Sequence, residues 1–139
     1  MTAAVRAIRG RLFSFTAEPA GMGDAASYTL IPDGMLRVED GRIAAVGPAA
    51  VLEPHLPPGT PVEDHGNRLV MPGFIDLHIH FPQTQVIASY GAQLLDWLTT
   101  YTFVEEQKYG DPAFAAAQAR FFLGELLRNG TTTAVVYGS

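Results

Sequence analysis

The sequence predicts an α/β protein in which a β-rich first half is followed by a parallel βαβ unit. The dipeptide Asp40-Gly41 stands between two apolar runs, which is among the strongest signals for a β-hairpin. An apolar run over residues 74–80 and a β-branched run over 131–137 flank a helical pattern. Two strands joined through a helix are expected to be parallel. We therefore divide the chain into a β-rich part over 1–69 and a βαβ part over 70–139.

The β-rich part is expected to contain several short strands. The strands are predicted over residues 4–15, 28–31, 35–39 and 42–46. One helical turn is predicted over 49–52. Pro32 is expected to end the strand that begins at Tyr28, because proline cannot donate a ladder hydrogen bond. The prolines between Pro48 and Pro61 predict a loop-rich stretch.

In the βαβ part the first strand is predicted to run from Leu69 through His80, followed by a loop over 81–91. A helical segment is predicted over 93–107, with a break near Tyr101 as one alternative. Its aromatic residues Trp97, Tyr101 and Phe103 could stack on a flat ring, but they are expected to pack in the core. Its charged end, which contains Glu105, Glu106 and Lys108, is interpreted as a solvated patch.

The second helix has clear end signals. Asp111 suits the N-cap, Pro112 suits the first helical position, and Gly130 suits the position just after the end. The residues expected to face the core are Phe114, Ala117, Phe121, Leu126 and Leu127.

Composition limits the classes of partner. The chain has 139 residues, a net charge of −5 and 47% apolar residues. This acidic balance argues against nucleic acid and anionic membranes as partners. No apolar stretch reaches the length of a membrane span, and the absence of cysteine removes disulfides and thiolate metal sites. The default expectation is a soluble cytoplasmic protein.

The strand over 74–80 carries the strongest candidate site. Because residues two apart on a strand share a face, Asp76, His78 and His80 are expected to lie on one side. Two imidazoles at that spacing can bind one metal ion. The competing interpretation is a pair of core histidines bonded to backbone. Asp76 is interpreted either as a carboxylate that orients a ligand histidine or as an acceptor of backbone N–H groups.

This site is incomplete by the usual count, since a catalytic zinc takes three protein ligands and an open position. The chain offers only two further histidines, His55 and His65, and both stand in polar stretches that contain proline or glycine. Either the remaining ligands lie in other sequence, or His78 and His80 are not ligands.

Four segments resemble a known family. PGFIDLHIH at 72–80 resembles the first barrel strand of the amidohydrolase superfamily, a group of metal-dependent hydrolases built on a (β/α)₈ TIM barrel. FPQ at 81–83, LLDWLTTYTFVEE at 94–106 and NGTTTA at 129–134 resemble the guanine deaminases of that superfamily. The resemblance implies the start of such a barrel, with its first two strands and crossover helices. Part of a small β-sandwich domain precedes it, and the chain is expected to form roughly the first third of the enzyme.

The resemblance also implies residue roles. His78 and His80 would bind zinc, although two imidazoles suit iron as well, and Gln83 would contact guanine. The reaction implied is the hydrolytic deamination of guanine to xanthine and ammonia, a step of purine catabolism, by a homodimer. No residue of this chain matches the family's proton-shuttling carboxylate, its other metal ligands or its guanine-binding arginine. No catalytic residue is therefore assigned, and the 139-residue chain alone is expected to be inactive.

Other interpretations stay open at this point. The chain could belong to another amidohydrolase that acts on an aminated heterocycle or a cyclic amide. It could also be a non-catalytic fragment that needs a partner chain. For Gln83 the competing interpretation is a solvated loop residue.

Overall fold

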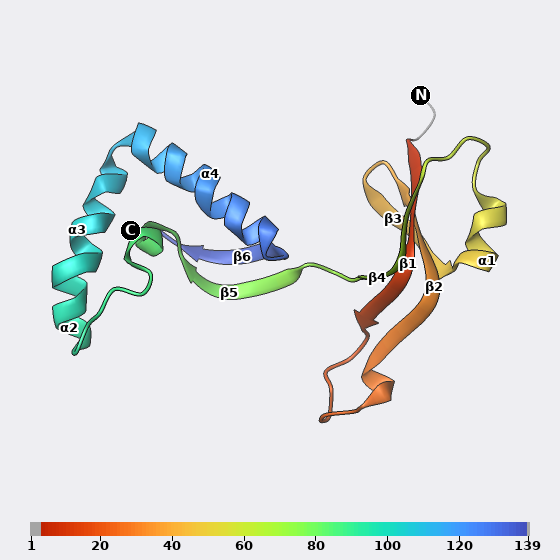
Figure 1. The fold of residues 1–139 in the computed structure, drawn as a ribbon, viewed down its shortest axis with the longest axis horizontal. Helices are drawn as coiled ribbons and strands as arrows, with labels where there is room; N and C mark the ends of the chain where they lie inside the picture. The colour runs from red at the N-terminus through yellow and green to blue at the C-terminus, as the bar shows by residue number, and fades with distance from the viewer. Residues whose placement is uncertain (1–3, 139) are drawn as a thin grey trace. The chain divides into compact units, whose positions relative to one another are not determined.

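A computed structural model describes residues 4–138 of the chain (Figure 1). The chain divides into two compact units, residues 1–72 and residues 73–139.

The first unit is a four-stranded sheet with the strand order β3-β2-β1-β4. Strand β1 pairs antiparallel with β2, β2 pairs antiparallel with β3, and β1 pairs parallel with β4. The strand bounds are Val5–Phe15 for β1, Tyr28–Glu39 for β2, Arg42–Pro48 for β3 and Val62–Val70 for β4. Three short helical turns complete the unit: η1 (Ala25–Ser27), α1 (Ala49–Leu52) and η2 (Glu53–His55).

The structure confirms the predicted hairpin. Glu39 of β2 pairs with Arg42 of β3, so the connection has two residues, Asp40 and Gly41. Their φ angles are 49° and 77°. Two central residues with positive φ are the pattern of a type I′ turn, whose twist matches that of the flanking strands.

The prediction that a strand ends at Pro32 was wrong, because β2 continues through it. Gly10 pairs with Gly34 and Leu12 pairs with Ile31, so two residues of β2 face the single residue between them on β1. A bulge of this kind leaves ladder positions unpaired, and a proline there loses no hydrogen bond.

The bulge is secured by an ion pair. Arg9 donates from Nε and Nη2 to the two carboxylate oxygens of Asp33, at 2.8 Å in each case. These hydrogen bonds, together with the positive charge of the guanidinium, hold the pKa of the Asp33 carboxyl below its usual range. Both side chains reach solvent, so the pair fixes geometry more than it adds stability.

The sequence analysis missed strand β4. It was also wrong to begin the next strand at Leu69, because Leu69 and Val70 end β4 and β5 begins at Phe74. The residues of β4, VEDHGNRLV, are mostly polar and show no alternation of apolar and polar positions. The topology gives the reason, because β4 is an edge strand, where charged side chains can remain in water and discourage pairing with other chains.

The core of the first unit is small. Ala7, Met35 and Ala49 are fully or almost fully buried, and the partly buried Leu52 and Leu56 pack against them. The predicted helical turn over 49–52 is confirmed as α1, and it supplies two of these five residues.

The second unit contains the predicted parallel pair of strands, β5 (Phe74–His80) and β6 (Thr131–Tyr137). Five helical elements connect them: η3 (Phe81–Val86), α2 (Leu94–Trp97), η4 (Leu98–Thr102), α3 (Phe103–Glu106) and η5 (Gln107–Gly110), followed by the long helix α4 (Pro112–Arg128). The predicted loop over 81–91 is therefore partly wrong, since its first six residues form a 3₁₀ helix.

The helical segment predicted over 93–107 is present but irregular. Its middle is a π-helical turn, η4, which includes Tyr101, the position of the predicted break. The expectation that its aromatic residues are core was wrong for Tyr101 and Phe103, whose side chains are 39% and 48% exposed. No helix among residues 4–138 is long and apolar enough to cross a membrane.

Helix α4 has the predicted ends. The Asp111 side chain accepts a hydrogen bond from the Ala113 N–H at 2.9 Å, and Gly130 follows the helix with a φ of 83°. The predicted core stripe was wrong for Ala117, Phe121 and Leu127, which are exposed, whereas Phe122 is buried. Phe122 packs against Phe81, which places the contact face one residue further round the helix than the spacing suggested.

Replacing Met35 with alanine should destabilise the protein, because Met35 is completely buried. Burial of this kind predicts a loss of about 2–5 kcal/mol in the free energy of unfolding. Chemical denaturation of the full-length protein measures it. Met22→Ala is the matched control, since Met22 is fully exposed and its loss should leave the free energy unchanged. Equal effects of the two substitutions would contradict the assignment of this core.

Candidate metal centre

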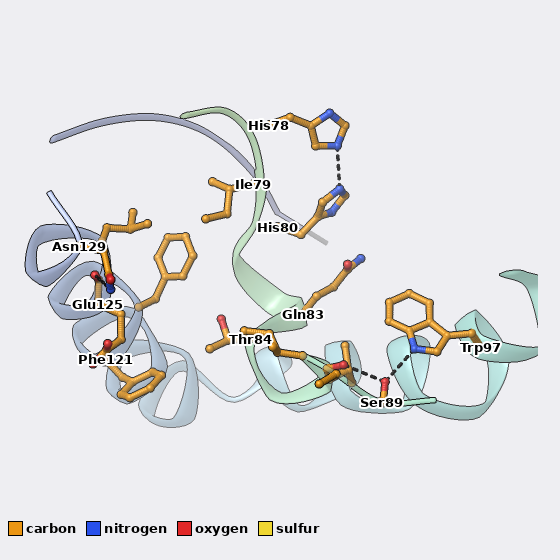
Figure 2. Close-up of a pocket in the computed structure, with 15 residues that line it drawn as sticks. His78, Ile79, His80, Gln83, Thr84, Ser89, Trp97, Phe121, Glu125 and Asn129 are labelled. Carbon is orange, nitrogen blue, oxygen red and sulfur yellow. Dashed lines mark hydrogen bonds between the residues drawn. The ribbon is translucent and has the colours of Figure 1, made fainter. Parts of the chain in front are cut away.

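Two imidazoles converge where β5 ends. His78 and His80 point to the same side of the strand, while Ile79 points to the other side, toward α4 (Figure 2). The Nε2 atoms of the two rings lie 3.0 Å apart. This arrangement follows from the two-residue repeat of a strand, as the sequence predicted.

A tyrosine that the sequence analysis did not single out flanks this pair. Tyr137 is the partner of His80 across the parallel ladder. Its ring centroid lies 4.6 Å from that of His78 and 5.1 Å from that of His80, and it stacks on His80 with an interplanar angle of 20°. The signal in the sequence was indirect, because it required the register of β5 against β6.

Asp76 interacts with the backbone of the same strand. Its Oδ1 accepts a hydrogen bond from the His78 N–H at 2.9 Å. This contact holds the backbone at the position from which the His78 ring projects.

The donor set fits a transition metal in part. Two nitrogens 3.0 Å apart can both bond one ion at the usual zinc–nitrogen distance of about 2.0–2.1 Å. Across the described part of the chain, no group of three or more histidine, aspartate or glutamate side chains is placed to hold a metal. His55 and His65 belong to the first unit. His78 and His80 thus supply two of the three protein ligands that a catalytic zinc site usually has.

Gln83 stands on η3, the turn that follows His80. Its Nε2 donates to Oε1 of Glu106 at 3.1 Å, so that a helix residue 23 positions later in the chain holds the amide. The interpretation of Glu106 as part of a solvated patch was therefore wrong in part, because this half-buried carboxylate accepts a hydrogen bond from Gln83. Glu105 does fit that interpretation, because it pairs with Lys108 at 2.6 Å and both side chains reach solvent.

The two histidines and Gln83 line one cavity of about 740 Å³. The other residues that shape it are mostly apolar and include Trp97, Phe121 and Phe122. Trp97 is fixed by a hydrogen bond from its indole N–H to Ser89 Oγ at 2.7 Å, shown in Figure 2. An apolar cavity with a few converging polar groups is the usual form of a small-molecule site.

Aromatic contacts hold the turn η3 in place. Phe81 meets Tyr109 edge to face, with ring centroids 5.0 Å apart, and the Thr84 hydroxyl donates to the Phe81 carbonyl at 2.7 Å. Burial raises the pKa of the Tyr109 phenol above its ordinary value; a hydrogen bond with Thr84 partly offsets this, and the charge of Glu105 adds to it.

Comparison with known proteins places the chain in a family. The sequence profile of the Amidohydrolase family matches residues 69–139. The chain therefore belongs to the amidohydrolase family.

The similar proteins include guanine deaminases and also a 5-methylthioadenosine/S-adenosylhomocysteine deaminase of Nitratidesulfovibrio vulgaris (strain DSM 19637 / Miyazaki F), which is 41% identical over 77% of this chain and 24% of its own length. The guanine deaminase of Escherichia coli (strain K12) is 38% identical over 97% of this chain and 31% of its own length. A crystal structure of guanine deaminase from Bradyrhizobium japonicum superposes with a TM-score of 0.89, at 40% identity over 98% of this chain and 30% of that one.

A third similar structure contains a ligand. It is the guanine deaminase of C. acetobutylicum with guanine bound in the active site. Its TM-score is 0.75 and its identity is 30%, over 97% of this chain and 30% of that one. The chain thus spans about a third of the length of the relatives it matches.

The raised pKa of Tyr109 predicts that the free energy of unfolding depends on pH. A pKa that is higher in the folded than in the unfolded state contributes stability below the unfolded value of about 10, and this contribution is lost as the pH rises through the folded value. The difference in absorbance near 295 nm between the natural protein and Tyr109→Phe should therefore titrate above pH 10. A midpoint at or below pH 10 would show that this phenol is not buried as described.

Proposed function

We propose that this chain forms the first part of a zinc-dependent guanine deaminase, which hydrolyses guanine to xanthine and ammonia. The observation that carries the proposal is the convergence of the His78 and His80 Nε2 atoms at the end of β5, with Gln83 on the next turn. The similarity to guanine deaminases, one of which holds guanine in its active site, supports the choice of substrate.

In this proposal the chain performs two tasks. His78 and His80 hold the metal through Nε2, and Gln83 offers one donor and one acceptor to the purine. A bound zinc ion supplies a water molecule made nucleophilic at neutral pH. Trp97 contributes an apolar wall to the cavity that Gln83 lines.

We further propose that β5 and β6 are the first two strands of a (β/α)₈ barrel over residues 70–139, preceded by part of a β-sandwich over 1–69. Active sites of such barrels lie at the carboxyl ends of the strands. This position agrees with His80 as the last residue of β5 and with Gln83 on the turn after it. A homodimer and a cytoplasmic location enter the proposal from the family resemblance alone.

The test is ammonia release from guanine by the full-length natural protein and by its His80→Ala variant. Loss of one of the two imidazoles should reduce zinc content and lower the rate by at least about 100-fold, since even the loss of residues that only orient metal ligands costs 10–100-fold. His55→Ala is the matched control, because it removes an exposed histidine of the first unit and should change neither quantity.

Three results would contradict the proposal at different points. Full activity of His80→Ala with normal zinc content would show that this strand is not a metal site. No turnover of guanine by metal-loaded natural protein would reject the substrate and favour another aminated heterocycle or a cyclic amide. An equal loss of activity and zinc in His55→Ala would show that the effect of His80→Ala comes from disturbed folding.

A further inference from the structure

We propose that Glu106 is a positioning residue that fixes the orientation of the Gln83 amide and so sets which hydrogen-bonding pattern the site presents to its purine. The inference rests on the proposed function, because it assumes that Gln83 contacts the substrate. It adds a residue on the crossover helix to the determinants of substrate recognition.

The geometry links two elements far apart in the sequence. Glu106 is the last residue of α3, and Gln83 is the third residue of η3. Their side chains are both half-buried, and Gln83 Nε2 lies 3.1 Å from Glu106 Oε1. The Gln83 side chain also lines the cavity with His78 and His80. The Gln83 amide is therefore held by Glu106 while the same side chain lines the cavity.

The Glu106 carboxylate determines which end of the Gln83 amide faces it. The two ends of a glutamine amide differ only in that one donates and the other accepts, so an unconstrained amide can turn by 180° at little cost. A carboxylate has no hydrogen to donate, so only the NH₂ end of Gln83 can face Glu106. One N–H and the Oε1 atom of Gln83 then remain for a ligand, in a fixed arrangement.

The arrangement of donor and acceptor on Gln83 affects how well a purine binds. Guanine places an acceptor beside a donor along its edges, as with O6 and the neighbouring N1–H. One donor and one acceptor of a single amide match such an edge in one orientation only. In the reverse orientation donor meets donor and acceptor meets acceptor, which leaves the buried groups unpaired.

The hydrogen bond is not needed to hold the turn itself. Two other contacts fix η3: the edge-to-face pair of Phe81 and Tyr109, and a hydrogen bond of 2.6 Å from Gln85 Nε2 to Gln118 Oε1 on α4. Removal of the Glu106 carboxylate should therefore free the amide without moving the turn.

The experiment compares Glu106→Gln, Glu106→Ala and Glu106→Lys in the zinc-loaded full-length protein, by steady-state deamination of guanine. Glutamine keeps an acceptor for Gln83 and should stay within about threefold of the natural kcat/KM, whereas alanine should lose roughly 3- to 10-fold. Lysine can only donate, so it should turn the amide round and cost more than alanine. The losses should lie mainly in KM, because Gln83 holds the base in the ground state and the transition state alike.

The same three substitutions in a Gln83→Ala background provide the decisive comparison. If Glu106 acts through the amide, the three should become equal within about twofold once the amide is gone. A purely structural or long-range electrostatic role would leave the differences in place. Glu105→Ala is the matched control, since it removes the neighbouring carboxylate that pairs with Lys108, and it should keep the natural kcat/KM.

The outcomes separate this inference from the proposed function. Natural activity of Glu106→Ala, a loss in Glu106→Lys no larger than in Glu106→Ala, or differences that persist in the Gln83→Ala background would each overturn it while guanine turnover stands. No turnover of guanine by the natural protein would instead reject the proposed function. A thermal transition recorded for every variant identifies one that fails to fold, and the alanine and glutamine variants then carry the comparison.

Discussion

The two-residue repeat of β5 is the constraint on which the candidate site depends. It places His78 and His80 on one face and Ile79 on the other, so a shift of one residue in register would turn both imidazoles toward α4. The parallel ladder with β6 prevents that shift and brings Tyr137 against both rings. At the other end of β5, a Cβ on Gly73 would collide with the Thr132 side chain, so the close approach of the two strands there requires glycine.

The turn after β5 is rigid because several elements hold it at once. Pro82 is buried and restricts the backbone, while side chains from α3, η5 and α4 contact the turn. Such support is what a binding group needs, since a side chain held before the ligand arrives does not lose its freedom on binding. The crossover helices thus serve the site directly, in addition to connecting the strands.

The sequence was sufficient where the signal was local. The hairpin at Asp40-Gly41 and the ends of α4 depend on residues that are neighbours in the chain, and His78 and His80 share a face by strand geometry alone. Prediction failed where the cause was distant. The bulge that admits Pro32 depends on β1, the polar β4 is a strand because it pairs with β1, and Glu106 meets Gln83 only after the crossover has folded back.

The structure assigns the two tasks of the proposed site to different supports. The proposed metal-binding face is set by β5 and β6, through backbone pairing that does not involve the crossover helices. The amide of Gln83 is set by α3, through one hydrogen bond between side chains. If Glu106 positions Gln83 as proposed, a substitution on α3 would alter which ring the site accepts while both imidazoles keep their positions. Under the proposed function, recognition of the ring and binding of the metal would therefore be separable by mutation.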